Sequence, residues 1–145
     1  MNLEIVALTE EYVDQVCILE EEAFSMPWHK ESFLEMIQNP NALYLTVLYE
    51  GKVVGSCGAR NIVGEGEITN VVVAKGYRNL HIGRRMLEEL LRKGQEMGME
   101  SFTLEVRESN AAAIHLYENL GFCTEGIRKN FYERPTENAL IMWKR

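Results

Sequence analysis

One stretch in the middle of the chain constrains the fold more than any other. Residues 67–73 form a run that ends in three valines, Val71, Val72 and Val73, which predicts a strand buried on both faces of a sheet. After a short basic loop, residues 82–98 carry an amphipathic helical pattern that Gly98 ends. The apolar positions of this helix are Met86, Leu87, Leu90, Leu91 and Met97. A buried strand that leads into a long helix is typical of α/β proteins.

The remaining segments alternate between the periods of strands and helices. We expect strands over residues 3–8, 43–49, 52–59, 101–107, 122–127 and 139–143, and helices after Thr9, over residues 30–38 and over residues 110–119. The order β-α-α-β-β-β-α-β-α-β-β predicts an α/β fold, in which helices pack on the faces of a mixed sheet.

Single residues predict where these elements begin, turn and end. Thr9 is expected to cap the first helix, and Ser109 or Asn110 the last, which Gly121 ends. Glu50-Gly51 predicts a tight turn, and residues 61–66 a loop, between consecutive strands. The first helix carries on nearby faces Val13, Val16, Cys17, Glu20 and Phe24.

Length and composition predict one domain over residues 1–145. The chain has 145 residues, of which 46% are hydrophobic and 26% charged, so it is long enough to bury a core and is not of a disordered class. Its three cysteines lack metal-ligand spacing, its N-terminus lacks a signal-peptide pattern, and no apolar run approaches about 18 residues. We therefore expect a cytoplasmic protein without a metal site and without a membrane span.

The charge is unevenly distributed along the chain. The formal net charge is −7, and residues 1–35 hold nine acids and one base, whereas residues 36–145 hold 13 acids and 14 bases. One interpretation is that the first quarter faces a cationic partner and the middle an anionic one. The alternative is a set of solvated helix faces. A nucleic-acid partner is not expected, because nucleic-acid-binding domains usually carry a net positive charge.

The loop before the long helix is a candidate anion site. The first backbone N–H groups of a helix, the positive end of its dipole and nearby arginines suit a phosphate. The loop has neither the Gly-Lys-Ser/Thr signature of a nucleoside triphosphatase nor the three glycines of a dinucleotide fingerprint, since only Gly76 and Gly83 are present. The alternative is an ordinary surface loop.

Three side chains are candidates for chemistry. Glu105 lies in a predicted strand on the face opposite Phe102, Leu104 and Val106, where a half-buried carboxylate could act as a general base. The alternative is a solvent-facing residue or an ion pair with Arg107. Tyr117 could donate a proton, or be a core residue with a polar tip. Cys57 has no base at a recognisable spacing, so we do not expect it to be a nucleophile.

These parts combine into a pattern that resembles the GNAT superfamily of acetyl-CoA-dependent N-acetyltransferases. Within it they are most similar to the bacterial ribosomal-protein-alanine N-acetyltransferases, the RimI type. The segments that carry the resemblance are Leu104-Glu105-Val106-Arg107-Glu108-Ser109-Asn110-Ala111-Ala112-Ala113, Leu116-Tyr117-Glu118-Asn119-Leu120-Gly121-Phe122, Pro27-Trp28, Ile68-Thr69-Asn70-Val71-Val72-Val73, Arg128-Lys129-Asn130-Phe131-Tyr132 and Ala139-Leu140-Ile141-Met142. The resemblance covers almost the whole chain.

The resemblance implies a GNAT fold: one mixed, mostly antiparallel sheet of six to seven strands with about four flanking helices. It implies acetyl-CoA as co-substrate, with Glu105 as general base and Tyr117 as the acid that protonates the leaving thiolate. The backbone of the valine strand would hold the pantetheine arm, the loop would hold the pyrophosphate, and Asn110 would also contact the coenzyme. The implied coenzyme-binding residues are Val71, Val72, Val73, Asn79, Leu80, His81, Ile82, Gly83, Arg84 and Asn110.

The acceptor implied by the resemblance is the N-terminal α-amine of a protein, specifically the N-terminal alanine of a small-subunit ribosomal protein. Transfer would be direct, within a complex of enzyme, coenzyme and acceptor. Two alternatives stay open: an acetyltransferase for a lysine side chain or a small-molecule amine, and an acyl-CoA-binding module without catalytic activity.

The sequence departs from the family pattern at three positions. His81 stands where the first glycine of the phosphate loop belongs, and Asn79 replaces a glycine common in relatives. Glycine suits such positions because the backbone approaches a phosphate closely there. Asn138 replaces an acid near the C-terminal signature. These departures predict weaker coenzyme binding and leave the acceptor less specified.

Overall fold

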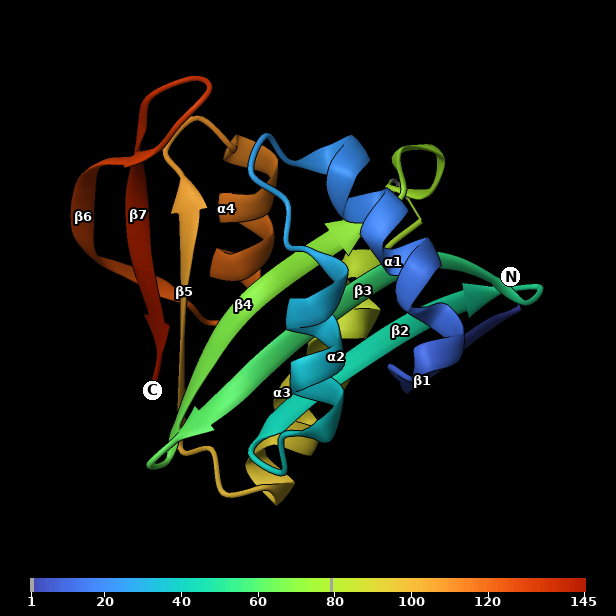
Figure 1. The fold of residues 1–145 in the computed structure, drawn as a ribbon. Helices are drawn as coiled ribbons and strands as arrows, with labels where there is room; N and C mark the ends of the chain where they lie inside the picture. The colour runs from blue at the N-terminus through green and yellow to red at the C-terminus, as the bar shows by residue number, and fades with distance from the viewer. Residues whose placement is uncertain (1, 79) are drawn as a thin grey trace.

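The protein folds around one seven-stranded sheet, as the computed structural model, which describes residues 2–78 and 80–145, shows (Figure 1). Along the chain the elements are β1 (Leu3–Ala7), α1 (Glu10–Ala23), α2 (Lys30–Gln38), β2 (Ala42–Tyr49), β3 (Lys52–Ile62), β4 (Glu65–Val73), a 3₁₀ turn η1 (Lys75–Tyr77), α3 (Ile82–Glu96), β5 (Ser101–Arg107), α4 (Ala111–Asn119), β6 (Cys123–Tyr132) and β7 (Glu137–Lys144). This is the order that the sequence predicts.

The strands lie in the order β1-β2-β3-β4-β5-β7-β6, and the sheet is mixed. Five of its neighbouring pairs are antiparallel, and the sixth, β4 with β5, is parallel. A parallel pair needs a crossover connection, and α3 supplies it between β4 and β5. The predicted fold class, a mixed and mostly antiparallel sheet with four flanking helices, is confirmed.

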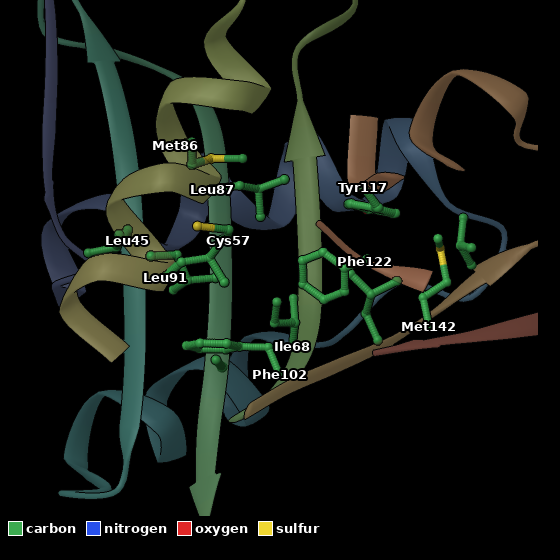
Figure 2. Close-up of a cluster of buried hydrophobic side chains, with 14 of the residues drawn as sticks. Leu45, Cys57, Ile68, Met86, Leu87, Leu91, Phe102, Tyr117, Phe122 and Met142 are labelled. Atoms are coloured by element: carbon green, nitrogen blue, oxygen red, sulfur yellow. The ribbon is translucent and has the colours of Figure 1, made fainter. Parts of the chain in front are cut away.

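The two faces of the sheet bury separate apolar clusters. On one face α3 and α4 pack against the sheet, and Figure 2 shows Met86, Leu87 and Leu91 of α3 over Cys57 and Ile68. On the other face α1 and α2 cover the sheet, with Val13, Val16, Leu19 and Phe33 buried against Tyr44, Leu48, Val53 and Val72. The apolar stripes predicted for the helices are therefore the faces that each helix buries.

A β-bulge in β4 changes which face its side chains occupy. Gly58 of β3 is opposite Asn70, but Ala59 is opposite Ile68, so Thr69 is one extra residue on β4. Because of this insertion, Ile68 belongs to the cluster beneath α3 while Val72 belongs to the cluster beneath α1 and α2. A bulge also bends its strand and increases the local twist.

Several details of the sequence interpretation are wrong. Thr9 occupies the N-cap of α1, but its side chain makes no capping hydrogen bond among the described residues. The predicted loop at residues 61–66 is a two-residue turn, because β3 and β4 continue to pair as far as Ile62↔Glu65. The last hairpin is longer than predicted. The valines of β4 alternate: Val72 is buried, while Val71 and Val73 are only partly buried.

The turn after β2, the glycines that end α3 and α4, and a cap of α4 are confirmed. Glu50 and Gly51 have φ of 50° and 80° in the turn between β2 and β3, and Gly98 and Gly121 have φ of 88° and 99° after α3 and α4. Of the two candidate caps for α4, Asn110 makes the bond: its Oδ1 accepts the N–H of Ala113 at 3.2 Å. In the described part of the chain, no helix is long and apolar enough to cross a membrane.

Candidate active site

β4 and β5 separate partway along their length. They pair only at Glu65↔Ser101, Gly66↔Phe102 and Glu67↔Thr103, after which the two strands diverge (Figure 1). The bulge residue Thr69 follows two residues after the last pair. The second half of β4 therefore has an edge towards β5 that no strand among the described residues covers.

The open edge of β4 exposes backbone groups of alternate residues. The N–H of Ala74 donates to the carbonyl of Val54 at 2.8 Å, so the backbone groups of Ala74 face β3. Because backbone groups alternate along a strand, those of Val73 and Val71 face the open edge, and those of Val72 face β3. Arg78 Nε donates to the carbonyl of Val73 at 3.3 Å. An extended ligand can pair with such an edge as an added strand does.

The start of α3 lies beyond the end of this strand and has the character of an anion site. His81 occupies the N-cap with φ 59° and ψ 21°, and its side chain makes no capping hydrogen bond in the described structure. The first intrahelical bond runs from Arg85 N–H to the carbonyl of His81 at 3.1 Å. The N–H groups of Ile82, Gly83 and Arg84 have no intrahelical acceptor at this position and are available to a phosphate.

The predicted loop residues differ in what they can offer. Leu80, His81 and Arg84 are exposed, whereas the Ile82 side chain is fully buried in the core, so only its backbone can contact a ligand. Asn79 lies outside the described residues. The side-chain oxygen of Asn110 is engaged as the cap of α4, so its contact with a coenzyme stays a prediction.

Gly83 is the point where α3, α4 and β4 meet. A Cβ on Gly83 would lie 3.3 Å from Leu116 Cδ2 and 3.8 Å from Val73 Cγ2, so glycine lets the first turn of α3 approach α4 closely. A hollow of about 250 Å³ lies between the end of β4 and α1, on the side of β4 away from α4. Its lining residues are Leu19, Glu22, Ala23, Val73, Ala74, Lys75 and Arg78.

Glu105 faces away from the core beneath α3, as predicted, since Leu104 and Val106 on either side of it are buried there. Arg128 Nη1 of β6 reaches across β7 and lies 3.0 Å from each carboxylate oxygen of Glu105. The alternative that Glu105 pairs with Arg107 is wrong: Arg107 pairs with Glu137 instead. The sheet order β5-β7-β6 places Arg128 beside Glu105, and no spacing in the sequence reveals that order.

Tyr117 projects from α4 into the core, with its ring centroid 6.0 Å from that of Phe122. Burial, with smaller contributions from Tyr132 and Cys57, raises the pKa of the Tyr117 phenol far above its ordinary value, so the hydroxyl stays protonated. Burial and the Glu105 carboxylate raise the pKa of Tyr132 to about 12. Tyr132 is therefore near enough to couple electrostatically with both Glu105 and Tyr117.

The sequence interpretation missed a buried polar group beneath α1. Glu20 is 2% exposed, and Asn70 Nδ2 donates to its Oε1 at 2.5 Å. The other carboxylate oxygen has no partner among the described residues, and burial raises the pKa of Glu20 to about 7. Tyr44 continues this network by contacting Thr69 and Asn70. The available signal was a carboxylate four residues after Val16, on the apolar stripe of α1.

The sequence interpretation also missed the group of residues that Arg107 holds together, although Arg107 lies two residues after Glu105 on the same face of β5.

Residues 2–78 and 80–145 contain no group of three or more His, Cys, Asp or Glu side chains that could hold a metal ion.

A family model described as acetyltransferase (GNAT) family matches residues 13–122, the region that includes the open strand, the anion site, Glu105 and Tyr117. The chain belongs to the GNAT family. As a member it is an acetyl-CoA-dependent N-acetyltransferase, and the open edge of β4 and the start of α3 fit that coenzyme.

Curated relatives and a solved structure agree with this assignment. The ribosomal protein bS18-alanine N-acetyltransferase of Escherichia coli (strain K12) is 35% identical over 128 residues, covering 86% of this chain and 84% of that protein. A Bacillus subtilis (strain 168) protein with the same name, provisionally assigned, is 37% identical and covers 92% and 89%. The crystal structure of the E. coli S18-alanine enzyme matches with a TM-score of 0.90 at 31% identity, over 99% of this chain and 93% of that one.

Proposed function

We propose that this protein transfers the acetyl group of acetyl-CoA to the N-terminal α-amine of an alanine, and that the acceptor is a small-subunit ribosomal protein. The names of its relatives support this acceptor, because they modify the alanine of ribosomal protein bS18. The strongest structural support is that Glu105 lies on the face of the sheet opposite α3, next to the region where β4 and β5 separate.

Each proposed residue has a separate part in the transfer. The backbone of Val71 and Val73 and the first N–H groups of α3 would hold acetyl-CoA, which supplies the activated acetyl thioester. Glu105 would take a proton from the α-ammonium, whose pKa of about 7.7–8.0 leaves much of it protonated at neutral pH. Tyr117, which burial keeps protonated, would give its proton to the departing sulfur. The amine nitrogen forms the new bond to the acetyl carbon as the carbon–sulfur bond breaks. The second proton that the nitrogen loses would restore the phenol of Tyr117, and Glu105 would pass the first to solvent.

The charge distribution supports a basic protein as the acceptor. The first 35 residues carry nine acids and one base, and they form α1 and the start of α2 on the face that Glu105 shares. Complementary charge of this kind speeds encounter with a basic chain more than it tightens binding. With an acceptor of this class, the proposal includes a cytoplasmic protein that works as one domain over residues 1–145.

An acceptor panel tests the proposal. The folded protein is incubated with acetyl-CoA and matched peptides that begin with alanine, that begin with a blocked alanine and carry an internal lysine, or that begin with another residue. Mass spectrometry should find acetylation of the free N-terminal alanine only. Acetylation of the lysine in the blocked peptide would favour the side-chain alternative. Coenzyme binding by calorimetry without transfer to any acceptor would favour the non-catalytic module.

A further inference from the structure

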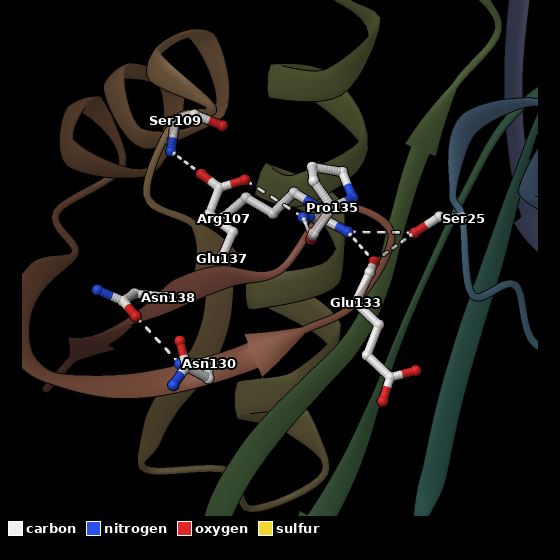
Figure 3. Close-up of polar contacts among 8 residues, drawn as sticks. All are labelled: Ser25, Arg107, Ser109, Asn130, Glu133, Pro135, Glu137 and Asn138. Carbon is white, nitrogen blue, oxygen red and sulfur yellow. Dashed lines mark hydrogen bonds and ion pairs between the residues drawn. The ribbon is translucent and has the colours of Figure 1, made fainter.

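Arg107 joins three segments that are far apart in the sequence (Figure 3). Its Nη2 donates to Ser25 Oγ at 3.1 Å, in the connection between α1 and α2, and to the carbonyl of Glu133 at 2.9 Å, in the connection between β6 and β7. Its Nη1 donates to the carbonyl of Pro135 at 3.0 Å and to Glu137 Oε1 at 3.2 Å. One guanidinium therefore holds both connecting loops.

The contacts around Arg107 reinforce one another. Ser25 Oγ also donates to the carbonyl of Glu133 at 3.0 Å, which links the two loops directly. Glu137 Oε2 accepts the N–H of Ser109 at 2.6 Å, and so connects the Arg107–Glu137 ion pair to the segment before α4. The Arg107 guanidinium also lies 4.5 Å from the ring centroid of Tyr132. Arginine suits this position because its planar group presents several donors in fixed directions, which lysine lacks.

The position of Arg107 connects these loops to the chemistry. Arg107 follows Glu105 by two residues, so both side chains lie on the same face of β5, opposite the core beneath α3. An amine must therefore reach Glu105 from the side that the two loops border. Ser25 is exposed to solvent, whereas Arg107 and Glu137 are mostly covered, with 24% and 17% of their side chains exposed.

We propose that Arg107 is a positioning residue, which holds the α1–α2 loop and the β6–β7 loop together as a preformed wall for the acceptor chain beside Glu105. This inference rests on the proposed function, because it assigns the wall to the acceptor of the same reaction. Preformed loops reduce the ordering cost that the acceptor would otherwise meet on binding.

Kinetics of Arg107→Lys provide the first test, with Arg92→Lys as the matched control, since Arg92 makes exposed ion pairs on α3 away from the site. We expect Arg107→Lys to raise the KM for an alanine peptide about tenfold, while the KM for acetyl-CoA stays within about twofold. Arg92→Lys should change neither value. An equal rise in both KM values, or a fall in kcat alone, would overturn the inference.

Hydrogen exchange provides the second test, and it does not depend on activity. In Arg107→Lys, the amides of residues 24–26, 28, 133, 134 and 136 should exchange faster together, roughly tenfold, while those of β2 and β3 keep their protection. Unchanged exchange in either loop would overturn the inference, whatever the acceptor. By contrast, failure of the unmodified protein to acetylate any alanine peptide, with the loops responding as expected, would refute the proposed acceptor alone.

Discussion

Glu105 is held by Arg128 on one face of β5, and this pairing orients the carboxylate without burying it. A half-buried carboxylate, 30% exposed, that can exchange Arg128 for another cation suits an amine that arrives charged. The two side chains proposed for proton transfer thus differ in setting: Glu105 is accessible, whereas Tyr117 lies in the core.

Replacing Glu105 tests its role as a base. We expect Glu105→Gln to lower kcat/KM at pH 7 by roughly 10²–10⁴-fold, the usual contribution of general acid–base catalysis. The loss should shrink as the pH rises above about 8, because the free amine then accumulates without a base. Rates measured from pH 6.5 to 9.5 check this. Glu108→Gln, three residues on and exposed, is the control; a loss independent of pH would indicate a structural role instead.

Tyr117→Phe should remove the proton donor and keep the ring in the core. We expect kcat to fall while the KM for acetyl-CoA stays within about twofold, since only transition-state interaction is removed. The apolar environment of the ring predicts a change of less than about 1.5 kcal/mol in the free energy of unfolding. Steady-state kinetics with a thermal melt check both. An unchanged kcat would assign Tyr117 to the core alone.

His81 adopts a left-handed conformation that costs most residues about 1–2 kcal/mol and costs glycine little. We expect His81→Gly to lower the KM for acetyl-CoA and to stabilise the fold by up to about 1 kcal/mol. His81→Ala should do neither, because alanine is also strained at this φ. Calorimetric titration with CoA compares the variants. Weaker binding in both would indicate that the imidazole itself contacts the coenzyme.

The site depends on element geometry: the bulge at Thr69 bends β4, and the end of this strand meets the start of α3 and Leu116 of α4 at Gly83. Gly58 belongs to the same region, because a Cβ there would lie 2.1 Å from the Tyr44 ring that contacts Thr69. The bend in β4, the Tyr44 ring and Gly58 therefore depend on one another.

The cap of α4 can be tested at this scale. Asn110→Ala removes the bond to Ala113 N–H and should lower the free energy of unfolding by about 1 kcal/mol, or about 3 °C in Tm. Ser109→Ala is the matched control and should stay within about 0.5 kcal/mol, since the bond to Glu137 uses the Ser109 backbone. Equal effects of the two changes would contradict the assignment of the cap.

Across the whole molecule, the stability should depend on pH through Glu20. The folded chain keeps a proton on Glu20 up to about pH 7, whereas the unfolded chain releases it near the ordinary glutamate pKa of 4.5. The unfolded state therefore binds fewer protons in this window, and the free energy of unfolding falls as the pH rises through it. The free energy of unfolding is therefore about 3 kcal/mol lower above pH 7 than it is below pH 4.5.

Glu20→Gln should remove this dependence, because glutamine does not ionise and still offers an oxygen to Asn70. We expect the variant to be more stable than the unmodified protein at pH 8 and similar at pH 5. Urea unfolding at four pH values from 5 to 8 checks the slope, with the exposed neighbour Glu21→Gln as control. The same slope in Glu20→Gln would show that another group titrates.

Patterns within single elements were enough to predict the element order and the apolar faces of α1 and α3, and to narrow the cap of α4 to Ser109 or Asn110. Those features depend on neighbours a few residues apart, so they are written in the local sequence. The family resemblance then extended the interpretation to the coenzyme and the acceptor. The loop at residues 61–66 was wrong because strand pairing, which depends on two strands at once, continued through it.

The sequence by itself determined which segments are strands and helices and which faces α1 and α3 bury, because hydrophobic period acts within each segment. Only the tertiary structure decided which distant side chains meet: Arg128 with Glu105, Glu20 with Asn70, and Arg107 with both connecting loops. Those contacts follow from the strand order β5-β7-β6 and from one inserted residue in β4. Burial and partner are properties of the assembled sheet, so no single segment specifies them.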